Sequence, residues 1–163
     1  FVINLLSLFV FRPLLTDLAR DWEGENIKEF TDIVKKMMIL IGALTIAACV
    51  GAYLLGIPIL SLVYGVDLRA YRMELVIIMI CGGLNAYVYC LYYVVTVTGK
   101  QIFLLLGYGA GLIFAVFLGS SFVKSLGMLG AALSCTLSFG VVFIVFLIIT
   151  SCVVKDRKKK TEV

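Results

Sequence analysis

Long uncharged apolar stretches alternate with short polar ones along the chain. Four stretches contain no charged residue, and each is longer than the roughly 20 apolar residues with which a helix crosses the hydrocarbon core of a membrane. They are Met37–Gly65, Leu75–Gly99, Gln101–Val123 and Ser125–Val154. Core helices of soluble proteins rarely run this far without a charge, so the pattern predicts four membrane-spanning helices.

Residues 1–11, FVINLLSLFVF, are apolar but too short to span a membrane. We expect them to be the end of a helix that starts further upstream. The predicted fold is therefore all-α: a polytopic membrane helix bundle with four full transmembrane helices and part of a preceding one. Residues 1–163 would form a single transmembrane region, the C-terminal piece of a larger membrane protein.

A polar segment, residues 12–36, leads into the first full span. It carries four basic and six acidic residues between Pro13 and Lys36. Apolar positions recur at helical spacing on both sides of DWEGEN, residues 21–26, which is typical of a turn around Gly24. We expect two helices joined by this turn.

The other connections are short, and the chain ends in a basic tail. They are residues 65–72, 98–101 and 120–127, with the tail at 155–163. If the spans alternate in direction, eleven of the fourteen lysines and arginines fall on the side of the 12–36 segment and the tail. Because basic residues favour the inner side, both segments are predicted to be cytoplasmic. We interpret the tail as a topology anchor near anionic lipid, not as a nucleic-acid site.

Composition adds to the membrane prediction and excludes several kinds of chemistry. The chain is 63% hydrophobic and 15% charged, a balance that would leave a soluble domain with large exposed apolar patches. It has no histidine, and its five cysteines lie in apolar stretches without a CxxC pair, so no metal site is predicted. No acidic pair lies within a span. We therefore expect no enzymatic activity, no catalytic residue and no cofactor.

The second span carries polar side chains at spacings of four, three and four residues. They are Asn85, Tyr89, Tyr92 and Thr96. This spacing places them on one helical face, which should turn toward other helices or a water-filled cavity because polar groups facing lipid are costly. The face is either a packed interface or part of a substrate path, and tyrosines suit a path for sugars because they combine a flat apolar ring with a hydroxyl.

Small residues concentrate in the third and fourth spans. Gly107 and Gly111 lie in GYGAG, where small side chains let another helix approach closely or let this one bend. Gly130 follows Gly127 in VKSLGMLGAALS, which superficially resembles a phosphate-binding loop. The motif is not GxGxxG, and no strand precedes it, so nucleotide binding is excluded. We expect Gly107, Gly111 and Gly130 to be helix-packing positions.

The order of these features resembles a known family. PLLTDLARDWEGENIKEF resembles the segment between helices in bacterial polysaccharide and O-antigen flippases, where a proline ends a helix. LGIPILSLVYGVDLRAY, YYVVTVTGKQ and LGMLGAALSCTLS are similar to helix ends and starts that follow in that family. The resemblance covers nearly the whole chain and agrees in order, spacing and sidedness.

This resemblance implies a transporter of the multidrug/oligosaccharidyl-lipid/polysaccharide superfamily in the bacterial plasma membrane. Such proteins move undecaprenyl-diphosphate-linked glycans outward through a cavity between two lobes, and this chain would supply the last helices of the second lobe. The implied partners are membrane lipids, the lipid-linked glycan and the N-terminal lobe. Cationic residues bind the diphosphate in this family, and only Arg72 and Lys124, at the outer rim, are basic candidates here. A drug or cation antiporter and a non-transporting membrane subunit remain the alternatives.

Overall fold

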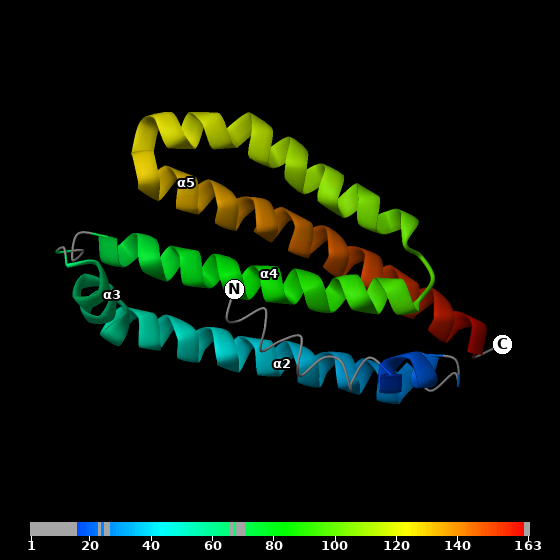
Figure 1. Cartoon of the computed structure of the whole chain (residues 1–163). Helices are drawn as coiled ribbons and strands as arrows, with labels where there is room; N and C mark the ends of the chain where they lie inside the picture. Colours follow the sequence, from blue (N-terminus) through cyan, green and yellow to red (C-terminus); the bar gives the residue numbers. More distant parts are fainter. Residues whose placement is uncertain (1–15, 23, 25–26, 66, 68–70, 162–163) are drawn as a thin grey trace.

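The computed structural model describes residues 16–22, 24, 27–65, 67 and 71–161 (Figure 1). These residues are almost entirely helical, and no strand occurs among them. The expected partial helix at 1–11 lies outside the described residues, as do Arg12, Arg69 and the last two residues of the tail.

The first long helix is bent near its far end. After a short helix at 16–22, the Gly24 amide donates to the Arg20 carbonyl at 2.8 Å and closes the turn expected there. α2, Ile27–Gly51, then runs directly into a π-helical segment, η1, Ala52–Gly56, and into α3, Ile57–Tyr64. The charge-free window starts at Met37, whereas α2 already begins at Ile27. Its first turns are amphipathic, with Ile27 and Phe30 buried.

The other two helices are α4, Arg72–Val97, and α5, Ile102–Thr161. α5 is not straight, because Gly127 has φ 58° and ψ −129°, a conformation that only glycine adopts without strain. The helix turns back at this residue, and its two arms run side by side (Figure 1). We call residues 102–126 the first arm and residues 128–161 the second arm.

The prediction of four full spans needs correction. Three helical stretches among the described residues are long and apolar enough to cross a membrane: Ile27–Tyr64, Arg72–Val97 and Ile102–Arg157. The count differs because the connection expected at 120–127 does not open into a loop. It stays helical up to the reversal at Gly127, and the Ser125 hydroxyl donates to the Ser121 carbonyl at 3.0 Å in the last turn before it.

α4 lies at the centre of the bundle, between α2 on one side and α5 on the other (Figure 1). One buried cluster joins α2 and α4 through Met37, Ile41, Ala86 and Cys90. A second joins α4 to both arms of α5 through Val88, Leu91, Val95, Leu104, Val142 and Phe146. Helix association therefore rests on two apolar seams, one on each flank of α4.

The 16–22 helix closes one end of the bundle. Leu18 is fully buried against Phe30 of α2 and Val94 of α4. Trp22 packs on Phe30 with ring centroids 5.0 Å apart, and the guanidinium of Arg157 lies 4.5 Å from the Trp22 ring centroid. Arg157 also donates to the Trp22 carbonyl at 3.0 Å, so the end of α5 is attached to this helix.

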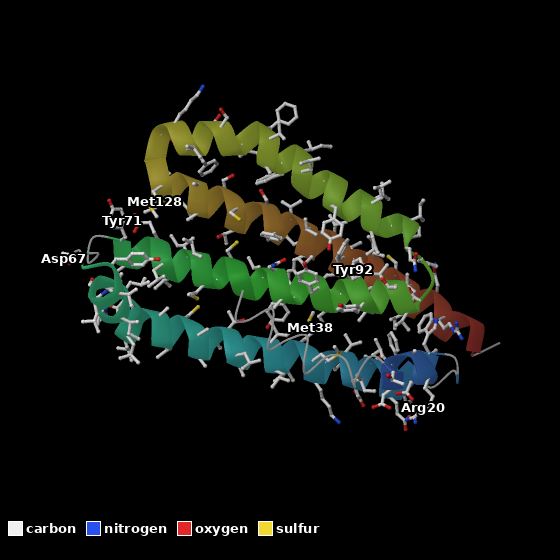
Figure 2. All side chains as sticks on the ribbon, in the orientation of Figure 1. Arg20, Met38, Asp67, Tyr71, Tyr92 and Met128 are labelled. Carbon is white, nitrogen blue, oxygen red and sulfur yellow. The ribbon has the colours of Figure 1, made fainter. Side chains whose placement is uncertain are left out.

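Polar segments gather at the two ends of the bundle. The 16–22 helix, the 98–101 turn and the end of α5 lie at one end, with the labelled Arg20 among them (Figures 1 and 2). The turn before α4 and the Gly127 reversal lie at the other end, marked by Asp67 and Met128 (Figure 2). This grouping matches the alternation of direction assumed in the sequence analysis.

Two cysteines provide a direct test of how α4 meets the second arm. The sulfur atoms of Cys81 and Cys135 are 3.4 Å apart, and both thiols are free. In a variant in which Cys49, Cys90 and Cys152 are alanine, we expect an added copper–phenanthroline oxidant to link them. The two thiols form a disulfide by losing two protons and giving two electrons to the oxidant. Neither cysteine then reacts with a maleimide that adds mass.

The matched control keeps Cys81 and Cys152 as its only cysteines. Cys135 and Cys152 are seventeen residues apart on one helical arm, which places them roughly 25 Å apart along its axis. Equal linkage of Cys81 to either cysteine would show that α4 and the second arm do not pack in the register described.

Candidate functional site: the polar face of α4

α4 uses two of its sides for packing. The side toward α2 carries Ala86 and Cys90, and Gly83 there lies against Thr45 of α2. On the same side the Tyr87 hydroxyl donates to the Met38 carbonyl of α2 at 3.0 Å. The side toward α5 carries Val88, Leu91 and Val95. A rotation of about 100° per residue leaves one remaining side of the helix.

The remaining side carries the predicted polar face. Asn85 and Thr96 are half-buried there, and Tyr89 is 42% exposed. Tyr92 lies at the edge of this side, where its ring packs against the apolar seam between α4 and α5 (Figure 2). The structure thus brings the four predicted residues to one side of α4, and none of the described helices covers that side fully.

The four residues differ in how their polar groups are satisfied. The Thr96 hydroxyl donates to the Tyr92 carbonyl at 2.8 Å, so its own helix already provides its partner. The Asn85 amide has no hydrogen-bond partner among the described residues. An unpaired amide is far more costly in lipid than a back-bonded hydroxyl. Asn85 is therefore the residue of this face that most requires a polar neighbour.

Tyr108 on the first arm of α5 extends the polar face, and the sequence analysis did not single it out. Its phenol lies close enough to those of Tyr89 and Tyr92 to interact with them electrostatically. Its ring meets Phe146 edge to face, with centroids 5.3 Å apart, and it is 42% exposed. In the sequence, Tyr108 stands out only as a tyrosine within GYGAG. The packing of α5 on α4 is what brings it close to Tyr89 and Tyr92.

The two basic candidates lie at the same end of the bundle but have different surroundings. Arg72 is half-buried at the start of α4, and its guanidinium lies 5.2 Å from the ring centroid of Tyr53. Lys124 is exposed near the end of the first arm. Neither lies at the depth of the polar face.

The three glycines named as packing positions have close neighbours. A side chain at Gly107 would collide with the ring of Phe146, and one at Gly111 would collide with Val142. Both neighbours lie on the second arm, so these glycines stand where the two arms touch. A side chain at Gly130 would collide with the backbone of Phe122 in the first arm, beside the reversal at Gly127.

The described residues contain no group of three His, Cys, Asp or Glu side chains that could hold a metal ion. No family model, curated protein or solved structure matches the chain. The candidate site is therefore defined by its geometry. It is a tyrosine-rich face on the side of α4 that the described helices leave open, and its Asn85 amide has no hydrogen-bond partner among the described residues.

Proposed function

We propose that the chain is the C-terminal part of a transporter that flips undecaprenyl-diphosphate-linked oligosaccharide or polysaccharide units across the bacterial plasma membrane. The observation that carries the proposal is the Asn85 amide, which has no hydrogen-bond partner among the described residues and lies one helical turn from Tyr89, whose phenol interacts with that of Tyr108. A face of this chemistry is costly against lipid, and it suits a hydrated path for sugars, which stack on aromatic rings and hydrogen-bond to amides and hydroxyls.

In this proposal the remaining helices of the transporter face α4 across the cavity, as the family resemblance implies. Each arm of α5 would cross the membrane separately. The three continuous helical stretches would then make four crossings. Arg72 and Lys124, at the outer end, would meet the diphosphate only when the cavity opens outward. The described spans contain no carboxylate near the polar face, which favours a glycan path over an ion-coupled antiporter site.

Replacing Asn85 by leucine or Tyr89 by alanine in the complete transporter should reduce glycan export about tenfold without reducing protein abundance, because each change removes hydrogen bonds to substrate but no buried contact. Export is measured as surface glycan, and abundance by immunoblot. Phe117→Ala is the control: Phe117 is 75% exposed on the first arm of α5, so export and abundance should stay unchanged. Abundance falling in step with export would identify the face as a packed interface instead.

The proposed topology places residues 12–36 and the tail 155–163 in the cytoplasm. Single cysteines at Ser125 and Thr161, in an otherwise cysteine-free protein, separate the two orientations. An impermeant maleimide added to intact cells should label position 125, beside the Gly127 reversal, and should leave position 161 unlabelled until the membrane is permeabilised. Labelling of position 161 in intact cells would reverse the orientation.

A further inference from the structure

A hollow of about 370 Å³ lies between α2 and the second arm of α5. Its apolar lining comes from three helices: Phe30, Val34 and Met38 of α2, Leu91 of α4, and Leu147 and Val154 of the second arm. Along the second arm it extends from Leu147 to Lys155, roughly 12 Å by the rise of a helix. Its volume is at the lower end of the range of roughly 300–1,000 Å³ that is usual for ligand pockets. So small a volume over this length has room for one slender chain.

Two hydrogen-bond donors without partners lie at one end of the hollow. Ser151 and Lys155 both line it from successive turns of the second arm. Both side chains are exposed, and neither has an ion pair or hydrogen bond with another described residue. The other two hydroxyls are not available as donors, because that of Thr31 donates to the Ile27 carbonyl at 2.7 Å and that of Thr150 is buried. An anion at this end would gain a charge-assisted hydrogen bond from Lys155 and a second bond from Ser151.

No carboxylate is found among the described residues that line this hollow, and Lys155 is the only charged residue among them. Asp156 follows Lys155 in sequence, but it is exposed and lies outside the lining. Asp32 of α2 lies 3.8 Å from Lys35, also outside the lining. The charge of the hollow is therefore purely positive, which favours an anionic ligand.

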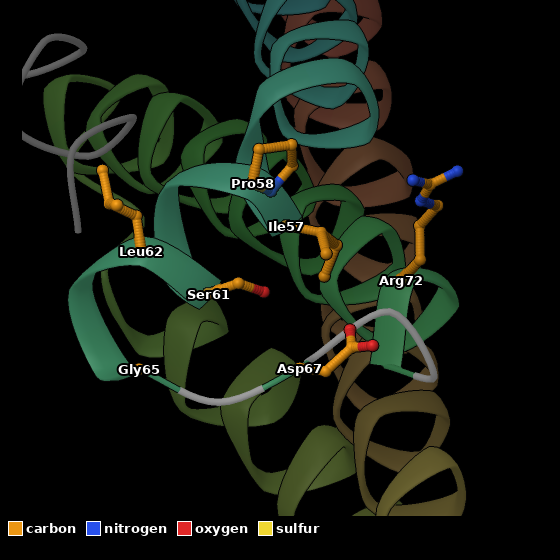
Figure 3. Close-up of a pocket in the computed structure, with 7 residues that line it drawn as sticks. All are labelled: Ile57, Pro58, Ser61, Leu62, Gly65, Asp67 and Arg72. Atoms are coloured by element: carbon orange, nitrogen blue, oxygen red, sulfur yellow. The ribbon is translucent and has the colours of Figure 1, made fainter.

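The larger hollow at the other end of the bundle differs in this respect. It has a volume of about 680 Å³, and Asp67 and Arg72, of opposite charge, both line it where α3 meets the start of α4 (Figure 3). Ser61 and Asp67 there already have interaction partners. Available donors of a single charge sign, next to an apolar interior, are thus a property of the hollow between α2 and the second arm.

The order of groups along this hollow matches the order of groups in a membrane leaflet. Lys155 and Ser151 lie at the end of the bundle where polar segments gather. Met38 and Leu147 lie further along helical stretches that are long and apolar enough to cross a membrane. A ligand with its charged group at Lys155 would therefore have its chain parallel to the helices, at the depth of the hydrocarbon.

We infer that this hollow binds a long-chain fatty acid. The carboxylate accepts hydrogen bonds from the Lys155 ammonium and the Ser151 hydroxyl, and the acyl chain runs inward between α2 and the second arm. A phospholipid fits less well, because the hollow has room for one chain and two donors suit one small charged group. The inference does not depend on the transport proposal, since Leu91, which lines the hollow, is turned about 120° around α4 from Asn85.

The single tryptophan of the chain reports on this hollow. Trp22 packs on Phe30, with ring centroids 5.0 Å apart, and Phe30 lines the hollow. Bromine atoms on an acyl chain quench indole fluorescence at short range. A dibromo fatty acid, ionised and added to the purified chain in detergent, should reach half-maximal quenching at about a tenfold lower mole fraction than the dibromo alcohol of the same chain, which carries no charge. The unbrominated acid should reverse the quenching.

Lys155→Gln should abolish this difference between the acid and the alcohol. Lys36→Gln is the matched control. Lys36 is also an exposed lysine, but it lies two residues beyond Val34 and so on the other side of α2, and its replacement should leave the difference unchanged. Val34→Phe should weaken quenching by the acid, because the larger side chain takes up space that the acyl chain needs.

Four outcomes would overturn the inference. Equal quenching by acid and alcohol in the unaltered chain would show that the carboxylate is not recognised. An equal effect of Lys155→Gln and Lys36→Gln would reduce the binding to general charge attraction. Dibromo phosphatidylglycerol as effective as the acid would assign the hollow to a membrane phospholipid. Undiminished quenching in a folded Val34→Phe protein would place the chain elsewhere. Should Val34→Phe fail to fold, the comparison of the two lysine variants still decides.

Discussion

Replacing Gly130 by leucine is expected to lower the free energy of unfolding of the bundle by about 3 kcal/mol, at the upper end of overpacking costs. A β-carbon at this position would collide with the carbonyl oxygen of Phe122, lie 2.6 Å from its carbonyl carbon and 3.0 Å from the β-carbon of Leu126. The obstacle is mainly backbone, which cannot move aside as the end of a flexible side chain can. The two arms of α5 would have to separate next to the Gly127 reversal.

Gly140→Leu is the matched control for Gly130→Leu. Gly140 lies on the same arm, and a β-carbon there would meet nothing within 4 Å. Both substitutions gain the same helix propensity of about 1 kcal/mol, so their difference isolates the contact with Phe122. Denaturation of the purified proteins in detergent measures that difference. Equal stability of the two variants would refute the account, and a stable Gly130→Leu protein that no longer transports would indicate a gating role for the turn.

This contact differs from the one expected from the sequence. From the sequence, Gly130 and the alanines that follow it were expected to pack on neighbouring helices, whereas the close neighbour of Gly130 is the preceding arm of its own helix hairpin. Ala132 is buried and Ala131 is exposed, so the small face is narrower than the run of small residues suggests. Composition indicates that a close approach is possible, but it does not identify the partner.

Hydropathy located the helices well because each window has to be long and free of charge to cross a membrane. It could not locate their breaks. The connection expected at 120–127 is reduced to a single residue, Gly127. The sequence could not identify this residue, because other glycines lie nearby and only the folded chain shows which one takes a positive φ. The π-helical turn before Pro58 is equally invisible to hydropathy, because the residues of that turn are as apolar as their neighbours.

The candidate site was predictable only in part, for a related reason. A helical repeat places Asn85, Tyr89 and Thr96 on one side of α4 from the sequence alone. Which side of α4 stays open depends on where α2 and α5 pack, and that depends on contacts between distant residues. For the same reason Tyr108 could not be assigned to the face before the fold was known.

The second large prediction concerns the glycines of GYGAG. They are neighbours in the sequence, but their surroundings in the structure differ. A β-carbon at Gly107 would collide with the ring of Phe146, which is fully buried, whereas one at Gly109 would meet nothing within 4 Å. Gly107→Leu should therefore lower the free energy of unfolding by about 2–3 kcal/mol, and Gly109→Leu should leave it unchanged or slightly raise it. Denaturation in detergent measures both.

A double-mutant cycle then distinguishes packing from bending at this position. If the role of Gly107 is to make room for Phe146, Phe146→Leu should recover more than half of the stability lost in Gly107→Ala, since the smaller side chain vacates the space that the new methyl group needs. If Gly107 serves instead as a flexible hinge in the first arm, the two losses should simply add, because a change on the second arm cannot restore backbone freedom to the first. Additive losses would thus reject close packing as the reason for glycine here.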